Sequence, residues 1–310
     1  MTSLNKEKKA KDFRRYIPLM VMCLPGVMYL VINNYLPMAG LVIAFKEYNY
    51  AKGIFGSDWI GFKNFEFLFR THDAFVITRN TVLYNILFII INTCGAIIVA
   101  ILLSEVTNTF LLRIYQTVIL LPYLISIVIV SYLVYAFLST DVGFINKTVL
   151  PALGREPISW YMEAKYWPGI LPIVNFWKGV GFTTIIYLSS IVGIDRTYYE
   201  AAELDGASKI QSIKNITLPL ITPVITIMLL LSVGRIFYSD FGLFYQVPMN
   251  SGAIYATTNV IDTYVYRGLM VLNNIGMAAA AGLYQSIVGF LLVIGSNLLV
   301  RKASPENALF

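Results

Sequence analysis

Charged residues are scarce in this chain, which has 13% Asp, Glu, Lys and Arg but 57% hydrophobic residues over 310 positions. Soluble globular domains carry about 25% charged residues, so this composition excludes an ordinary soluble domain. The chain is therefore predicted to be an integral membrane protein. No tandem repeat or low-complexity linker divides it, and one membrane domain is the simplest organisation.

Histidine and cysteine are nearly absent as well. The single histidine, His72, excludes a histidine-based metal cluster, and Cys23 and Cys94 lie in apolar segments without metal-ligand spacing or an evident disulfide partner. We therefore predict no metal site and no catalytic thiol. Because His, Cys and carboxylate residues do not cluster within the apolar segments, a membrane-embedded enzyme is the least favoured class.

A phosphate-binding loop of the form G-x-x-x-x-G-K-[ST] is missing, since even the dipeptide Gly-Lys does not occur. Any ATP-driven activity would therefore need an ATPase on another chain. The net charge of +6 does not indicate nucleic-acid binding, because no basic face with interleaved aromatic residues follows the N-terminus. Six basic residues instead form a predicted cytoplasmic anchor: Lys6, Lys8, Lys9, Lys11, Arg14 and Arg15.

Long apolar runs fill most of the remaining sequence. The first, residues 16–45, carries no charge and is too long for a signal peptide, while Pro18, Pro25 and Pro37 predict a kink or a non-helical outer end. Five further helices are predicted in runs near the length of a bilayer span, at residues 80–103, 114–140, 167–194, 220–243 and 275–299. The predicted fold is all-α and polytopic, with six transmembrane helices.

Six spans divide the chain into a basic N-terminus (1–15), a membrane domain (16–299) and a tail (300–310). They also place both termini on the same side as the polar stretch 195–219. That side carries twelve Lys and Arg residues against nine on the other. Because positively charged loops stay in the cytoplasm, we predict that both termini and this stretch are cytoplasmic.

The stretch Glu200 to Pro219 is a polar island between two apolar runs, with the pattern E-A-A, three residues, Gly, nine residues, Ile, one residue, Leu-Pro. Thr197 and Glu200 have the spacing of a capping box, which predicts a helix start near Thr197. Gly206 permits a positive φ between two short helices. Leu218-Pro219 suits the first turn of the next membrane helix.

Two interpretations of this island are open: a connecting loop in which Glu200 only caps a helix, or a docking element. The complete spacing resembles the EAA loop of permease subunits of binding-protein-dependent ABC importers. That resemblance implies the type I importer permease fold and a coupling helix that docks on a cytoplasmic ATPase. The residues it assigns to ATPase coupling are Glu200, Ala201, Ala202, Asp205, Gly206, Ile216, Leu218 and Pro219.

Further segments are similar to the carbohydrate-importing branch of this family, especially permeases for oligosaccharides and polysaccharide fragments: 35–40, 43–46, 59–62, 194–208 and 260–267. The resemblance implies a bacterial cell membrane protein that forms half of a heterodimeric pore. Its partners would be a second permease, two ATPase subunits that carry the ATP and Mg²⁺, an extracellular solute-binding protein, a carbohydrate and membrane lipid. No cofactor on this chain itself and no nucleic acid is implied, and a peptide or amino-acid substrate stays open.

Three ionisable residues fall within the predicted spans: Lys178 in the fourth, and Arg235 and Asp240 in the fifth. Such groups are costly in a bilayer and usually face a cavity or a partner, so they are candidates for a translocation pathway. Lys178 could instead reach the outer interface and serve the structure. The alternative class is an ion-coupled secondary transporter that uses these three residues, which leaves the EAA spacing unexplained.

Overall fold

The computed structural model describes residues 2–66, 68 and 71–303, with side chains from residue 16 onward. The side chains of the predicted basic N-terminus and residues 304–310 of the predicted tail lie outside this description. In the described part of the chain, five helices are long and apolar enough to cross a membrane, and a bent pair makes a sixth span. The prediction of an all-α, six-span fold is confirmed.

The first span, Tyr16–Phe45, contains most of α1 (Thr2–Leu30), a π-helical turn (Val31–Tyr35), α2 (Leu36–Met38) and a 3-10 helix (Ala39–Phe45). The other spans are α5 (His72–Ser104), the pair α6 (Thr109–Leu124) and α7 (Ile127–Leu138), α9 (Trp167–Val192), α12 (Leu218–Gly234) and α16 (Ile275–Ala303).

Short elements connect the spans. The connection from the first span to α5 contains a two-stranded antiparallel sheet, β1 (Lys46–Glu47) with β2 (Asp58–Trp59), together with α3 (Gly53–Gly56) and a 3-10 turn (Lys63–Phe65). The connection from α7 to α9 contains a π-helical turn (Ile145–Val149), α8 (Leu150–Ala152) and a 3-10 turn (Ala164–Tyr166). The connection from α9 to α12 contains α10 (Arg196–Leu204), α11 (Lys209–Ser212) and a π-helical turn (Ile213–Thr217). The last contains α13 (Phe241–Gln246), a 3-10 turn (Gly252–Ile254), α14 (Tyr255–Thr258) and α15 (Ile261–Met270).

Each π-helical turn in the described residues ends two positions before a proline: Pro37, Pro151 or Pro219. A proline has no N–H for the carbonyl four residues earlier, and its ring clashes with that carbonyl. The wider turn accommodates this defect and lets the helix continue. Leu218 is the first residue of α12 and Pro219 lies in its first turn, as predicted, but the helix continues without a break from α11, so the span extends from Lys209 to Gly234.

The third span is not the single helix predicted for residues 114–140. It bends by 93° between α6 and α7, at Ile125 and Ser126. The Ser126 side chain accepts a hydrogen bond from the N–H of Val128 and so starts α7 in a new direction. The bend leaves carbonyl groups at the end of α6 without helical partners, and another part of the chain must satisfy them.

The fifth span also differs from the prediction, because α12 ends at Gly234 and α13 begins only at Phe241. Arg235 and Asp240 therefore lie in a break, not inside a helix as predicted. Two carboxylates hold the backbone there: Asp262 accepts a hydrogen bond from the N–H of Ser239 at 2.7 Å, and Asp240 accepts one from the N–H of Leu243 at 3.0 Å.

The packed centre is formed by α5 and α9, which lie side by side and share two clusters of buried residues. One cluster centres on Phe88, Trp167 and Phe244, and the other on Ala96, Tyr187 and Ile221. Helix α6 approaches α9 so closely that a Cβ at Gly181 would lie 1.8 Å from the carbonyl oxygen of Ile119. Only glycine fits at this crossing.

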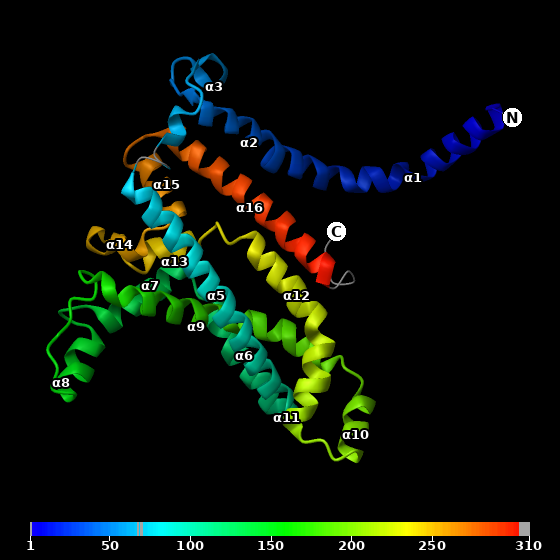
Figure 1. Ribbon diagram of the computed structural model, residues 1–310. Helices are drawn as coiled ribbons and strands as arrows, with labels where there is room; N and C mark the ends of the chain where they lie inside the picture. The colour runs from blue at the N-terminus through cyan, green and yellow to red at the C-terminus, as the bar shows by residue number, and fades with distance from the viewer. Residues whose placement is uncertain (1, 67, 69–70, 304–310) are drawn as a thin grey trace.

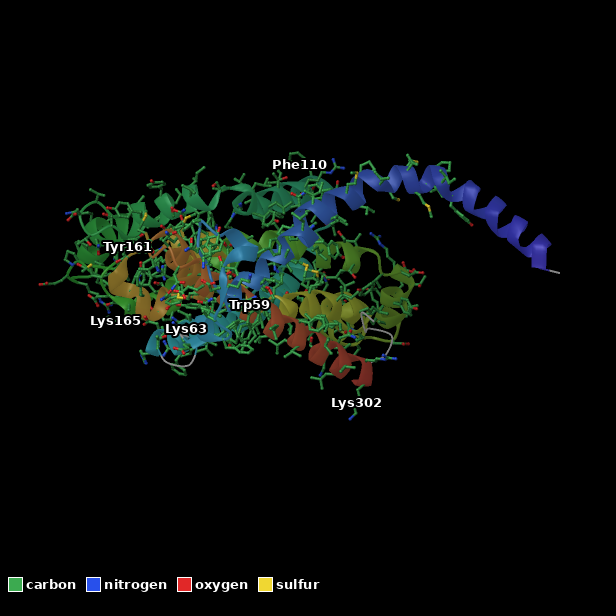
Figure 2. All side chains as sticks on the ribbon, turned by 90° about the horizontal axis from the view of Figure 1, so that it is seen from above. Trp59, Lys63, Phe110, Tyr161, Lys165 and Lys302 are labelled. Carbon is green, nitrogen blue, oxygen red and sulfur yellow. The ribbon has the colours of Figure 1, made fainter. Side chains whose placement is uncertain are left out.

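Helix α1 leaves this bundle, as Figures 1 and 2 both show. None of the most apolar window of the first span is buried within the chain. Figure 1 places α8, α14 and α15 at one end of the bundle, and α10, α11 and the end of α16 at the other.

Candidate functional site

The polar island forms a helix, a turn and a second helix at one end of the bundle. Helix α10 begins at Arg196, because the Asp195 side chain accepts a hydrogen bond from the N–H of Thr197 at 3.0 Å. The predicted capping box of Thr197 and Glu200 is therefore wrong: the aspartate two residues earlier supplies the cap. The backbone N–H of Thr197, followed by its side chain, holds the pKa of Asp195 below its ordinary value.

Gly206 ends the first helix with a φ of +78°, as the sequence predicts. The N–H of Ala207 then bonds the carbonyl of Ala202 at 2.9 Å, which closes the helix end. No atom lies within 4 Å of a Cβ built at Gly206, so the backbone conformation and not space demands glycine. A capping box of Ser208 and Gln211 starts α11.

The eight predicted coupling residues divide into two groups. Glu200, Ala201, Asp205 and Gly206 are exposed on α10 and its turn, and Ala202 beside them is half-buried. Ile216 and Leu218 are half-buried in the helical run that leads into α12, where Leu218 packs against the inner core cluster, and exposed Pro219 follows. The first group is exposed, whereas Leu218 anchors the island to the bundle.

Exposed apolar side chains lie beside the first group. Leu204 is 90% exposed at the end of α10, and Ile210 is 78% exposed on α11. They leave apolar surface on α10 and α11 that no described part of the chain covers. Two contacts fix this surface to the bundle: the hydroxyls of Tyr199 and Thr217 are 2.9 Å apart, and Lys209 forms an ion pair with Glu105 after α5.

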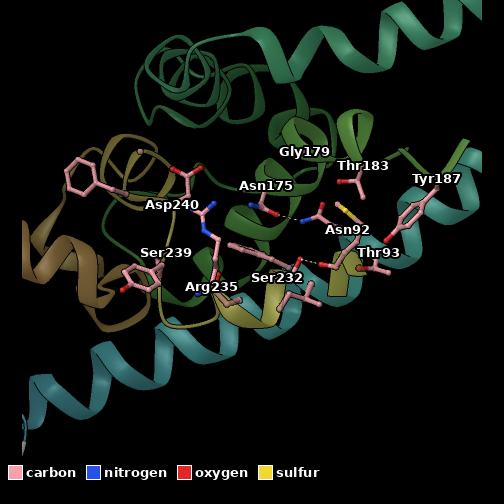
Figure 3. A pocket seen from close by; sticks show the side chains of 17 residues that line it. Asn92, Thr93, Asn175, Gly179, Thr183, Tyr187, Ser232, Arg235, Ser239 and Asp240 are labelled. Atoms are coloured by element: carbon pink, nitrogen blue, oxygen red, sulfur yellow. Dashed lines mark hydrogen bonds between the residues drawn. The ribbon is translucent and has the colours of Figure 1, made fainter. Parts of the chain in front are cut away.

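A second candidate site is a pocket of about 610 Å³ inside the bundle, shown in Figure 3. Helices α5, α9 and α12 and the break before α13 line it. This volume lies within the range of small-molecule sites. The wall is rich in amides and hydroxyls, although the surrounding helices are apolar: Asn85, Asn92, Thr93, Asn175, Thr183 and Ser232.

Arg235 and Asp240 both line this pocket, whereas Lys178 does not. The Lys178 ammonium group donates to the carbonyls of Tyr123 at 3.1 Å and Ile125 at 2.7 Å, and more distantly to that of Pro122 at 3.5 Å. It thus caps the end of α6 at the bend of the third span. The structure brings Arg235 and Asp240 together at the pocket and places Lys178 apart from them, at the end of α6.

Sequence analysis missed the amide pair at the centre of the pocket. Asn92 donates a hydrogen bond to the side-chain oxygen of Asn175 at 2.7 Å, from α5 to α9, as Figure 3 shows. Both residues could have been singled out from the sequence, since each is an amide within an otherwise apolar run. Among the described residues, no group of three His, Cys, Asp or Glu side chains could hold a metal ion.

The fold and the EAA pattern agree with a family model. The model for binding-protein-dependent transport system inner membrane components matches residues 75–305, and this chain belongs to that family. It is thus a transporter permease subunit of the ABC importer type.

Individual relatives match over nearly their whole length. The polygalacturonan/rhamnogalacturonan transport system permease protein YteP of Bacillus subtilis is 33% identical over 305 residues, covering 97% of this chain and 94% of YteP. A chain of a bacterial ABC transporter involved in the import of the acidic polysaccharide alginate is 32% identical, with a TM-score of 0.87, covering 96% of this chain and 99% of that one. A chain from the alginate transporter in complex with alginate pentasaccharide-bound periplasmic protein has the same identity and a TM-score of 0.86, covering 95% and 97%.

Proposed function

We propose that this chain is one of two permease subunits of an ATP-driven importer for an oligosaccharide, delivered by an extracellular binding protein. The observation that carries this proposal is the island of α10 and α11. It has the complete EAA spacing, a left-handed Gly206 between its helices, and exposed Glu200 and Leu204 at the end of the bundle. These features suit a helix that docks in a groove of an ATPase subunit.

The transport cycle requires the island to transmit motion in both directions. Closure of two ATPase subunits around ATP and Mg²⁺ would move α10, and the contacts of Tyr199 with Thr217 and of Lys209 with Glu105 would carry that motion to α12 and α5. Since α5 and α12 line the pocket, its walls would shift between two global states. This chain would itself bind no ATP, Mg²⁺ or other cofactor.

The unburied first span supports a second permease as partner. Membrane helices associate by close packing, and residues 16–38 have almost no contacts of that kind within the chain. A neighbouring permease subunit would cover part of this surface and membrane lipid the rest. The chain would lie in a bacterial cell membrane with both termini in the cytoplasm.

An oligosaccharide is the proposed cargo for two reasons. The names of the relatives describe import of polygalacturonan, rhamnogalacturonan and alginate, all carbohydrate polymers. The pocket, in addition, combines amides and hydroxyls with the aromatic residues Phe88, Tyr238 and Phe241, which suits the hydroxyl groups and apolar faces of sugar rings. The pocket would form part of the path across the membrane.

Affinity purification of the tagged chain in mild detergent, followed by mass spectrometry, tests the assembly. Recovery of a second EAA-type permease and an ATPase with a phosphate-binding loop is the expected result. A homo-oligomer without an ATPase would overturn the proposal and favour the ion-coupled transporter, with Arg235 and Asp240 as its site.

A further inference from the structure

Arg235 occupies an unusual position at the wall of the pocket. It is the first residue after α12 and follows the last residue of the apolar span Lys209–Gly234, at the end of that span away from the polar island. Its side chain is exposed and lines the pocket. Among the described residues, its guanidinium group has no ion pair, hydrogen bond or aromatic ring as a partner.

An arginine at the end of an apolar span has a costly charge unless water, a carboxylate or a ligand compensates it. Asp240 is the acidic residue in the same wall, and the described structure contains no ion pair between the two. One oxygen of Asp240 already accepts a hydrogen bond from the N–H of Leu243, which starts α13. The pocket therefore presents a guanidinium group that forms no ion pair with the carboxylate in its own wall.

The break that carries Arg235 is held firmly from behind. Asp262 on α15 accepts hydrogen bonds from the N–H of Ser239 at 2.7 Å and from the Gln285 side chain at 3.3 Å. Gln285 on α16 also donates to the carbonyl of Phe237 at 2.8 Å. These contacts fix the backbone on both sides of Tyr238, so the position from which Arg235 reaches the pocket is fixed as well.

The opposite wall supplies groups that suit hydroxyls. Asn92 donates to Asn175, and its own side-chain oxygen is buried without a hydrogen-bond partner among the described residues. A buried acceptor without a partner is costly, and a ligand donor would satisfy it once the Asn92 side chain turned this oxygen toward the pocket. Gly179 of α9 lies beside this oxygen, since a Cβ built there would be 3.7 Å from it.

We propose that this pocket is a subsite for a uronate unit, in which the guanidinium group of Arg235 pairs with the sugar carboxylate while Asn92 and Asn175 bind ring hydroxyls. Planar guanidinium matches a carboxylate through two parallel hydrogen bonds, and this match distinguishes an acidic sugar from its neutral counterpart. The inference rests on the proposed import of oligosaccharides and narrows the cargo to acidic ones.

The test is uptake into proteoliposomes that contain the complete transporter and its binding protein. The two labelled probes are pentagalacturonate and the neutral pentasaccharide obtained by reducing its carboxyl groups. The measured quantity is the ratio of acidic to neutral uptake in each variant, divided by the same ratio in the wild type. Any preference of the binding protein cancels in this quotient, because the binding protein is the same throughout.

Arg235→Gln is expected to lower the ratio about tenfold to a hundredfold, the range for loss of a charged hydrogen-bonded pair. Arg235→Lys keeps the charge without the planar fork, so its ratio falls less. The matched control is Arg155→Gln, which removes the same charge from an exposed position of the predicted outer segment, outside the pocket. Its ratio is expected to equal that of the wild type.

Three results overturn the subsite: equal loss of both sugars in Arg235→Gln, an equal fall of the ratio in Arg155→Gln, or wild-type import of the neutral sugar alone. If Arg235→Gln does not assemble, an unchanged ratio in Arg235→Lys overturns it. If the wild-type transporter imports neither sugar, both the proposed subsite and the proposed oligosaccharide cargo are overturned. Recovery of the ATPase and second permease would still leave the permease function standing.

Discussion

Lys178 provides the sharpest test of how this structure holds its bent third span. Its ammonium group reaches from α9 to the end of α6. There it donates to the carbonyl of Tyr123 in the last turn of α6 and to that of Ile125 at the bend. Lys178→Met keeps a side chain of similar length but removes the charge and the donors. The carbonyls at the end of α6 then lose their partner in apolar surroundings.

The expected cost follows from these contacts. A hydrogen bond to a charged group contributes about 1.5–3 kcal/mol, and a cation at a helix C-terminus about 0.3–2 kcal/mol. The two shorter contacts share one ammonium group and are not additive, so we expect Lys178→Met to lower the free energy of unfolding by about 2–4 kcal/mol. Denaturant titration of the purified protein in detergent measures this change.

A matched control is available in Lys147, an exposed lysine in the predicted outer segment. Lys147→Met is expected to change the free energy of unfolding by no more than about 0.5 kcal/mol. Equal stability of Lys178→Met and wild type would refute the capping role. Loss of uptake by Lys178→Met at unchanged stability would instead return Lys178 to the transport pathway.

Three further predictions concern the polar island. Gly206→Pro and Glu200→Arg are expected to leave the protein in the membrane but to abolish uptake coupled to ATP hydrolysis. Gly206→Asn should retain uptake, because asparagine tolerates the left-handed conformation. Unchanged coupled uptake in Gly206→Pro and Glu200→Arg would contradict ATPase docking. Asp195→Ala should reduce hydrogen-exchange protection of amides in α10, whereas Asp195→Asn should preserve it. Because the folded-state pKa of Asp195 is lowered, its cap stabilises α10 fully at pH values above the ordinary aspartate pKa, and this stabilisation is lost as the pH falls through the lowered pKa. Hydrogen-exchange protection of α10 that does not change with pH over this range would contradict the assignment. Tyr199→Phe removes the hydroxyl contact with Thr217 and should lower the free energy of unfolding by about 1 kcal/mol. It should also weaken the stimulation of the ATPase by substrate. Stimulation equal to that of the wild type would exclude this contact as a route of coupling.

Sequence reasoning was most successful where the physical cause is local. The fourth span was predicted at residues 167–194 and is Trp167–Val192, because a long apolar run needs no distant contact to form a membrane helix. The left-handed Gly206 followed from the lack of a Cβ. The helix before the EAA motif was predicted to start near Thr197 and begins at Arg196, because Asp195 and not Thr197 supplies the N-cap.

Sequence reasoning could not tell which of the three candidate pathway residues would share a pocket. Arg235 and Asp240 were singled out because ionisable residues are rare in apolar runs, and both line the pocket. Lys178 satisfied the same criterion but binds backbone carbonyls of another helix. The sequence shows that a charged residue lies in an apolar run but not which group compensates its charge. For Lys178 that group is the carbonyl of Ile125, which lies 53 residues away in the chain.

The sequence by itself determined the membrane class, the number of spans and the spacing of the EAA island, because hydropathy, charge and turn residues act over a few positions. Only the tertiary structure decided where two of the spans break. The 93° bend after α6 depends on Lys178 of α9, and the break after α12 depends on Asp262 of α15 binding the backbone at Ser239. Both breaks lie within runs that were predicted as single helices, and at each a polar side chain from a distant helix binds backbone groups that the break leaves without helical partners.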